Sequence, residues 1–184
     1  GRPPCSSSEP GGPRGAVDSD SIDTLSGAPL RPRVAAATPS RPAEHASVAQ
    51  GWRARLELEF AREGAATRLA HRRHLGPLAV QRPFFPEGPD VCHVYLLHPP
   101  GGVVGGDRLQ IDVRVATGAH ALVTTPAATK VYRTAGPAAA QEIALTVESG
   151  GALEWLPQET IMYDGADVSL ATRVALAPGA RFLG

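Results

Sequence analysis

Hydrophobic and polar residues alternate with a period of two along four long segments of the chain, at 52–60, 109–115, 143–147 and 168–176. In the first segment, apolar side chains from Trp52 to Phe60 are separated by Arg or Glu. This period is typical of β-strands that bury one face. Shorter apolar runs predict further strands at 66–72, 77–82, 91–98, 119–124, 151–156 and 180–184.

Helical patterning is weak throughout the chain. No window of a dozen residues carries a clean apolar stripe with a 3.6-residue period. The best helical candidate places Thr125 at the N-cap and Pro126 at the first helical position, and continues from Ala127 to Tyr132. Such a helix would put Lys130 and Arg133 one turn apart as a small cationic patch. We therefore predict an all-β chain with at most one or two short helices.

A weak internal repeat suggests how the strands are arranged. Three of the alternating strands lead to a small turn, a Gly-Ala pair and another apolar run, with the glycines at Gly118, Gly151 and Gly179. Their spacing of about 30 residues lies within the range of stacked architectures. The repeat predicts a two-layer β-helix or solenoid-like stack, in which each unit covers the apolar face of the last. A β-sandwich built from ordinary hairpins is the alternative.

Amino-acid composition separates residues 1–50 from the rest of the chain and excludes several classes of function. Residues 1–50 are rich in Pro, Gly and Ser and lack apolar periodicity, so we predict a disordered tail followed by a β-domain over 51–184. The 18 basic and 18 acidic residues balance without a basic stripe, which argues against nucleic acid as a partner. No apolar run is long enough to cross a membrane. The first residues contain no apolar run typical of a secretory signal, and the two cysteines lie in different segments, so we expect a cytoplasmic protein.

The segment from Pro99 to Asp107 contains Gly101, Gly102, Gly105 and Gly106. Glycines permit positive φ and let the backbone approach a ligand or another chain closely. A P-loop is excluded because no Gly-Lys-Ser/Thr follows, and a dinucleotide fingerprint is excluded because no helix follows. Taken alone, the segment predicts a tight loop in which Asp107 bonds backbone amides.

Two further segments carry polar chemistry. Lys130 is the one lysine of the chain, and a salt bridge to Asp107 or Glu159 is its simplest interpretation. The segment 153–164 contains Gln158, Glu159 and Asp164, whose oxygen atoms suit a hard or borderline cation.

Histidine and cysteine spacing predicts no tight metal site. On the strand 91–98, Cys92 and His98 share one face while His93 takes the other, and His71 and His74 face opposite sides of theirs. The sequence contains no Cys-x-x-Cys and no nucleophile elbow. We therefore expect neither an enzyme nor a tightly bound cofactor.

Five segments follow one another in order between residues 52 and 184. They are Leu56-x-Leu58-x-Phe60, Gly76-Pro77-Leu78 with Gln81-Arg82-Pro83-Phe84 and Pro86-Glu87, Leu97-x-Pro99-Pro100-Gly101-Gly102 to Gly106-Asp107, Thr125 to Tyr132, and Leu153 to Ile161. Together they resemble the urease accessory protein D family, which is called H in some organisms.

The resemblance implies a urease maturation factor. In this family the protein is a scaffold that binds the helical accessory protein F, which carries the nickel-binding GTPase G, and the complex docks on apo-urease and supports nickel insertion. Nickel would be held only transiently. The family continues beyond the position matching Gly184, so we expect a C-terminally truncated part.

The resemblance also assigns residues to a transient nickel path. Asp107 and Glu159 match acidic positions of the family's motifs and would line the path, with Thr125, Lys130 and Gln158 as polar support. Gly101, Gly102 and Gly106 would form the adjoining loop.

Two other functions stay open at this point. A β-sandwich or solenoid module that binds proteins without a direct metal role is the main alternative. A β-solenoid enzyme acting on polysaccharide would need an aromatic-lined groove, and aromatic residues make up only 5% of the chain.

Overall fold

A computed structural model describes residues 51–184, and the predicted tail at 1–50 lies outside the described residues. Twelve β-strands and no helix occur between residues 51 and 184, which confirms the predicted all-β class. In this part of the chain, therefore, no helix is available that could span a membrane.

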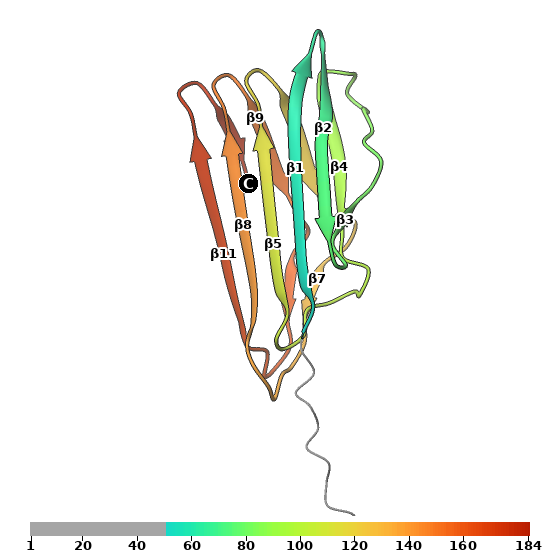
Figure 1. Ribbon diagram of the computed structural model, residues 1–184, viewed down its shortest axis with the longest axis vertical. Helices are drawn as coiled ribbons and strands as arrows, with labels where there is room; N and C mark the ends of the chain where they lie inside the picture. Colours follow the sequence, from blue (N-terminus) through green and yellow to red (C-terminus); the bar gives the residue numbers. More distant parts are fainter. Residues whose placement is uncertain (1–50) are drawn as a thin grey trace, which may run out of the picture. The chain divides into compact units, whose positions relative to one another are not determined.

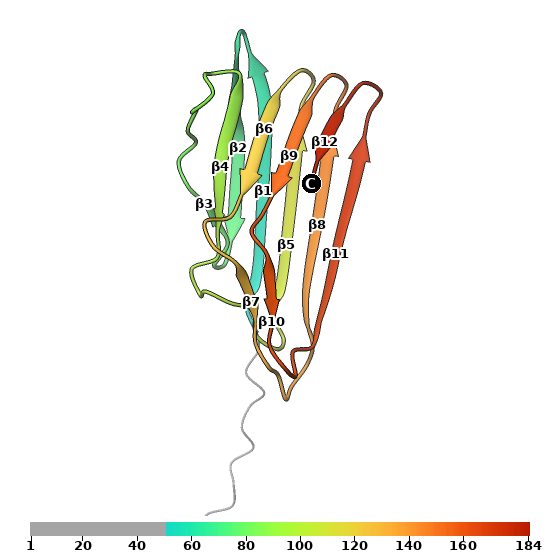
Figure 2. The ribbon, with the colours of Figure 1, turned by 180° about the vertical axis from the view of Figure 1, so that it is seen from behind.

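The strands form two five-stranded sheets and one small sheet, visible from opposite sides in Figures 1 and 2. The first sheet contains, in spatial order, β11 (Val168–Leu176), β8 (Ala139–Val147), β5 (Arg108–Val115), β1 (Arg53–Glu63) and β2 (Ala66–Leu75). The second contains β12 (Arg181–Leu183), β9 (Ala152–Leu156), β6 (His120–Thr124), β4 (Val91–Leu97) and β3 (Ala79–Val80). The small sheet contains β10 (Thr160–Met162) and β7 (Thr129–Val131).

Successive coils stack in parallel. β5, β8 and β11 pair in parallel in the first sheet, and β6, β9 and β12 do so in the second. Each coil runs up one strand, through a tight turn and down the other layer, as the three neighbouring turns at the top of Figure 1 show. Only β2 and β3 run antiparallel to their neighbours. The predicted two-layer stack is therefore confirmed.

The tight turns correct the register of the predicted repeat. Gly150, and not Gly151, is the counterpart of Gly118 and Gly179, because Ala152 pairs with both His120 and Arg181. The three equivalent glycines have φ values of 69°, 68° and 75°. A residue with a Cβ is strained at such angles, which explains why each turn has glycine at this place.

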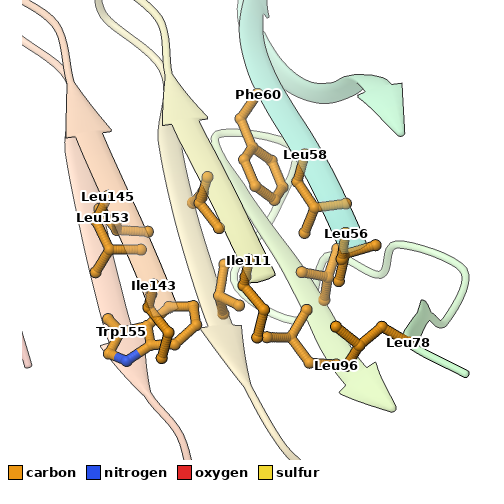
Figure 3. Packing of buried hydrophobic residues seen from close by; sticks show 14 of the residues in the cluster. Leu56, Leu58, Phe60, Leu78, Leu96, Ile111, Ile143, Leu145, Leu153 and Trp155 are labelled. Carbon is orange, nitrogen blue, oxygen red and sulfur yellow. The ribbon is translucent and has the colours of Figure 1, made fainter. Parts of the chain in front are cut away.

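Alternation along the strands produces the core between the two layers. Leu56, Phe60, Leu145 and Leu153 are buried almost completely, and their side chains point into the space between the sheets in Figure 3. Trp155 lies beside Ile143 in the same cluster, with 9% of its surface exposed. Burial of these faces is the main stabilising contribution, at roughly 25 cal/mol per Å² of apolar surface.

The predicted helix over 125–132 is wrong. Residues 129–131 form β7, which pairs in parallel with β10, and Val131 also bridges to Val103. Neighbouring coils supply backbone partners: Thr129 N donates to Glu159 O at 2.9 Å, and Tyr132 N donates to Val103 O at 2.9 Å. These bonds replace those of a helix, so tertiary pairing overrides the local signal.

The cationic patch expected from that helix is also absent. Arg133 pairs with the exposed Asp164, with 3.3 Å between Nη2 and Oδ2. Lys130 makes no salt bridge with any residue from 51 to 184, so its expected partners Asp107 and Glu159 are not its partners in the structure.

Replacement of Leu145 by alanine tests the core. Leu145 is 1% exposed, so Leu145→Ala should lower the free energy of unfolding by about 2–5 kcal/mol, through lost burial and a residual cavity. Leu75→Ala is the matched control, because Leu75 is 66% exposed and its loss should cost less than about 0.5 kcal/mol. Urea denaturation of both variants measures the difference, and equal losses would contradict the assigned core.

Candidate functional site

Asp107 lies at the lower end of the stack, just before β5, and is completely buried. Its Oδ1 accepts a hydrogen bond from Trp52 N at 2.7 Å, and its Oδ2 accepts one from Val104 N at 2.9 Å. Hydrogen bonds to a charged acceptor are stronger than neutral ones. The carboxylate therefore joins the residue before β1 to the glycine-rich loop.

The loop glycines allow close packing around this carboxylate. Gly101 and Gly106 have φ values of 77° and 86°. A Cβ at Gly102 would collide with the Tyr132 ring, and a Cβ at Gly51 would collide with the carbonyl carbon of Gly106. These glycines thus let the loop lie against β7 and against the chain that enters β1.

A small cavity of about 90 Å³ lies between the layers above this loop. Its floor is apolar and includes Ile111 and Trp155. The polar side chains that line it come from several coils and are His98, Thr125, Thr129, Gln141, Gln158 and Thr160. Thr125 and Gln158 are joined directly, because Thr125 Oγ1 accepts a hydrogen bond from Gln158 N at 2.9 Å.

A second hollow, of about 400 Å³, borders the first. It is lined by Gly101, Gly102 and the segment from Thr125 to Lys130, and it shares His98 and Thr125 with the inner cavity. Lys130 is half-buried at this hollow. The predicted residues Thr125, Gln158, Lys130, Gly101 and Gly102 therefore do come together around two adjoining hollows.

The two predicted carboxylates lie beside these hollows without lining them. Asp107 is fully used by its backbone hydrogen bonds. Glu159 is exposed, and its backbone carbonyl holds β7 through Thr129 N. Among residues 51–184, no group of three or more His, Cys, Asp or Glu side chains is placed to hold a metal ion together.

His98 is a site residue that the sequence patterns do not predict. It lines both hollows, and its Nε2 is buried without a hydrogen-bond partner in the described part of the chain. Burial lowers the pKa of His98, while the nearby Asp107 carboxylate acts in the opposite direction. A neutral imidazole is a common metal ligand. Its position directly before Pro99-Pro100-Gly101-Gly102 is the signal that could have identified it.

Among residues 51–184, the other histidines and Cys92 do not line the two hollows. Burial raises the pKa of the Cys92 thiol, which packs in the core. His93 lies on the opposite face of β4, with 2.9 Å between its Nε2 and Glu87 Oε1. His71 and His74 are exposed on β2.

The fold defines the class of this protein: a β-helix-like stack with two layers and a polar hollow at one end. A family model described as UreD urease accessory protein matches residues 52–184, which is almost the whole described domain. The chain belongs to this family, and the resemblance seen in the sequence motifs is confirmed.

Curated relatives agree with this assignment. The chain is 58% identical over 137 residues to the urease accessory protein UreD of Delftia acidovorans, covering 74% of this chain and 45% of the relative. It is 54% identical over 133 residues to UreD of Pseudomonas putida, covering 72% and 48%. It is 49% identical over 138 residues to UreD of Cupriavidus metallidurans, covering 75% and 47%. The chain thus spans about half the length of these relatives.

Removal of the Asp107 carboxylate should destabilise the fold. Asp107→Ala removes a completely buried carboxylate and leaves the amides of Trp52 and Val104 without this partner, so the free energy of unfolding should fall by about 2–4 kcal/mol. The control is Asp112→Ala, because Asp112 pairs only at the surface with Arg55, and its loss should cost less than about 1 kcal/mol. Equal unfolding midpoints in urea for the two variants would contradict the assigned role of Asp107.

His98 should also make stability depend on pH. Because burial holds the folded-state pKa below its ordinary value of 6.5, the unfolded chain binds more protons in mild acid. The contribution of His98 is complete above the unfolded-state pKa, falls as pH drops through 6.5, and is fully lost below the folded-state pKa. His98→Gln should flatten this part of the profile. Urea denaturation across this range checks it, and an unchanged difference between wild type and variant would refute it.

Proposed function

We propose that this chain acts in urease maturation as a non-catalytic scaffold that assists nickel insertion into apo-urease. Membership of the UreD urease accessory protein family supports the proposal. The proposed partners are accessory proteins F and G and the urease apoprotein, and the proposed location is the cytoplasm. Nickel is cargo in this scheme and passes through without being retained.

The single observation that carries the metal role is the pair of adjoining hollows with His98 at their border. Imidazole nitrogen suits nickel, and the hydroxyl and amide oxygens of Thr125 and Gln158 are weaker ligands beside it. A conduit requires weak binding, because every 1.4 kcal/mol of added affinity slows release by about tenfold at a fixed rate of association. A mixed set of neutral ligands satisfies that requirement.

The charged residues have supporting roles in the proposal. Asp107 lies close enough to favour the protonated form of His98, so its charge also favours a metal cation at that imidazole. Glu159 is exposed next to Gln158 and would be a first carboxylate contact. Thr125 fixes the backbone of Gln158, and Lys130 would limit the residence of a cation in the outer hollow.

Nickel content of matured urease tests this role. In the full accessory complex, His98→Gln and Glu159→Gln should lower the nickel content of urease while F and G remain bound, because the first variant loses a ligand at the hollows and the second loses a first carboxylate contact beside them. Loss of one such group costs about tenfold or more in metal affinity. The matched control is Glu63→Gln, which removes an exposed carboxylate at the end of β1, away from both hollows.

The outcome also separates the proposal from its alternative. Unchanged nickel content with either variant would contradict a metal path through this site. A protein-interaction module without a metal role is the second candidate, and the exposed apolar residues Ile161, Met162 and Tyr163 around β10 favour it. If the chain is such a module, substitutions at these three residues should abolish binding of F and G. His98 variants should then leave the nickel content of urease unchanged.

A further inference from the structure

Strand β2 has an open edge. It is the last strand of the first sheet and pairs only with β1, on the right of the sheet in Figure 1. Thr67 N donates to Pro89 O at 2.9 Å, and the Leu69 backbone forms a hydrogen bond with the Cys92 thiol, but no backbone–backbone hydrogen bond joins residues 70–75 to any described residue outside β1. Such an edge presents unpaired N–H and C=O groups that can bind another extended chain.

Positive charge is concentrated along this edge. The segment 66–82 contains Arg68, Arg72, Arg73 and Arg82 and no acidic residue, although the whole chain is neutral. All four arginines are exposed, and none makes a salt bridge within residues 51–184. By contrast, Arg55, Arg62, Arg114 and Arg133 each lie against a carboxylate. Arg68 already stacks over the Phe85 ring, with 5.3 Å from its guanidinium carbon to the ring centre, whereas Arg72, Arg73 and Arg82 can accept carboxylates from another molecule.

A groove runs beside the open edge. It has a volume of about 720 Å³ and lies between residues 69–72 of β2 and the Arg82-Pro83 segment. Arg72 pairs in register with the buried Leu58, so it lies on the face of β2 that is turned toward the second layer. Arg72 and Arg82 thus line one groove from two different elements, and Leu69 and Pro83 supply apolar contact.

We propose that this groove binds an extended acidic segment of a partner protein, which joins the first sheet as a strand beside β2 and places carboxylates against Arg72 and Arg82. The free backbone edge selects an extended peptide over nucleic acid, because phosphates cannot continue the ladder of a sheet. The arginines also disfavour a second copy of this chain, because pairing two β2 edges would bring like charges together. The site is separate from the metal path and does not depend on it.

Direct binding of a synthetic peptide tests the proposal. The probe is a capped peptide of about ten residues in which Glu and Val alternate, the length of a long strand. Its controls are the same peptide with Lys in place of Glu and a single-stranded oligonucleotide of equal charge. The complete 184-residue chain should bind the Glu peptide in preference to both controls, and more weakly as salt rises. Hydrogen exchange should then show new protection of amides between residues 70 and 75.

Charge reversal locates the contact. The double variant R72E/R82E should bind the Glu peptide about tenfold more weakly or worse, since two exposed charge pairs become repulsive. R173E is the matched control, because Arg173 is exposed on β11 at the opposite edge of the same sheet, and it should bind as wild type does. Circular dichroism confirms that the variants fold.

Several results would overturn the proposal. If R72E/R82E and R173E bound the Glu peptide with equal affinity, Arg72 and Arg82 would not be part of the contact. In the wild-type chain, protection outside β2, or tighter binding of the oligonucleotide than of the Glu peptide, would exclude peptide addition at this edge. Self-association that protects the β2 amides would identify a second copy as the occupant.

Discussion

Parallel pairing between successive coils is the constraint on which the rest of the structure depends. Each coil has the same tight turn at one end, where Ala119, Gly151 and Ala180 donate to the residue three positions earlier at 3.1, 2.9 and 3.0 Å. With one end fixed, the strands of both layers stay in register, and the variable segments gather at the other end. The loop before Asp107, β7 and β10 are brought together in this way, as the lower part of Figure 2 shows.

The long strands were predictable because apolar and polar residues alternate along them, which in β1, β5 and β8 gives one buried face and one more exposed face. β1, β5 and β11 have bounds close to those expected from alternation alone. Short segments were not predictable, because their conformation depends on a neighbour. The expected strand over 77–82 is reduced to the two residues of β3, which pair with the end of β4, and the expected helix over 125–132 contains β7.

The site was predictable only in part, for a similar reason. Thr125 and Gln158 are far apart in sequence but occupy adjacent coils. The internal repeat, in its correct register, therefore places them side by side. Asp107 was identified as important, yet its two backbone hydrogen bonds appear only when Trp52 and Val104 are brought to it by the fold. His98 stands beside a recognisable Pro/Gly segment, but the cavity that it lines is completed by residues from distant coils, which the sequence around His98 does not reveal.

Paramagnetic broadening by nickel tests the central claim, that a metal passes this site, most directly. Substoichiometric Ni²⁺ would be added to the labelled chain, and imidazole and amide signals would be followed by nuclear magnetic resonance. The account predicts that His98 broadens first, together with Thr125 and Gln158, because these residues border the same cavity. Broadening confined to the exposed His71 and His74, with His98 unaffected, would contradict it.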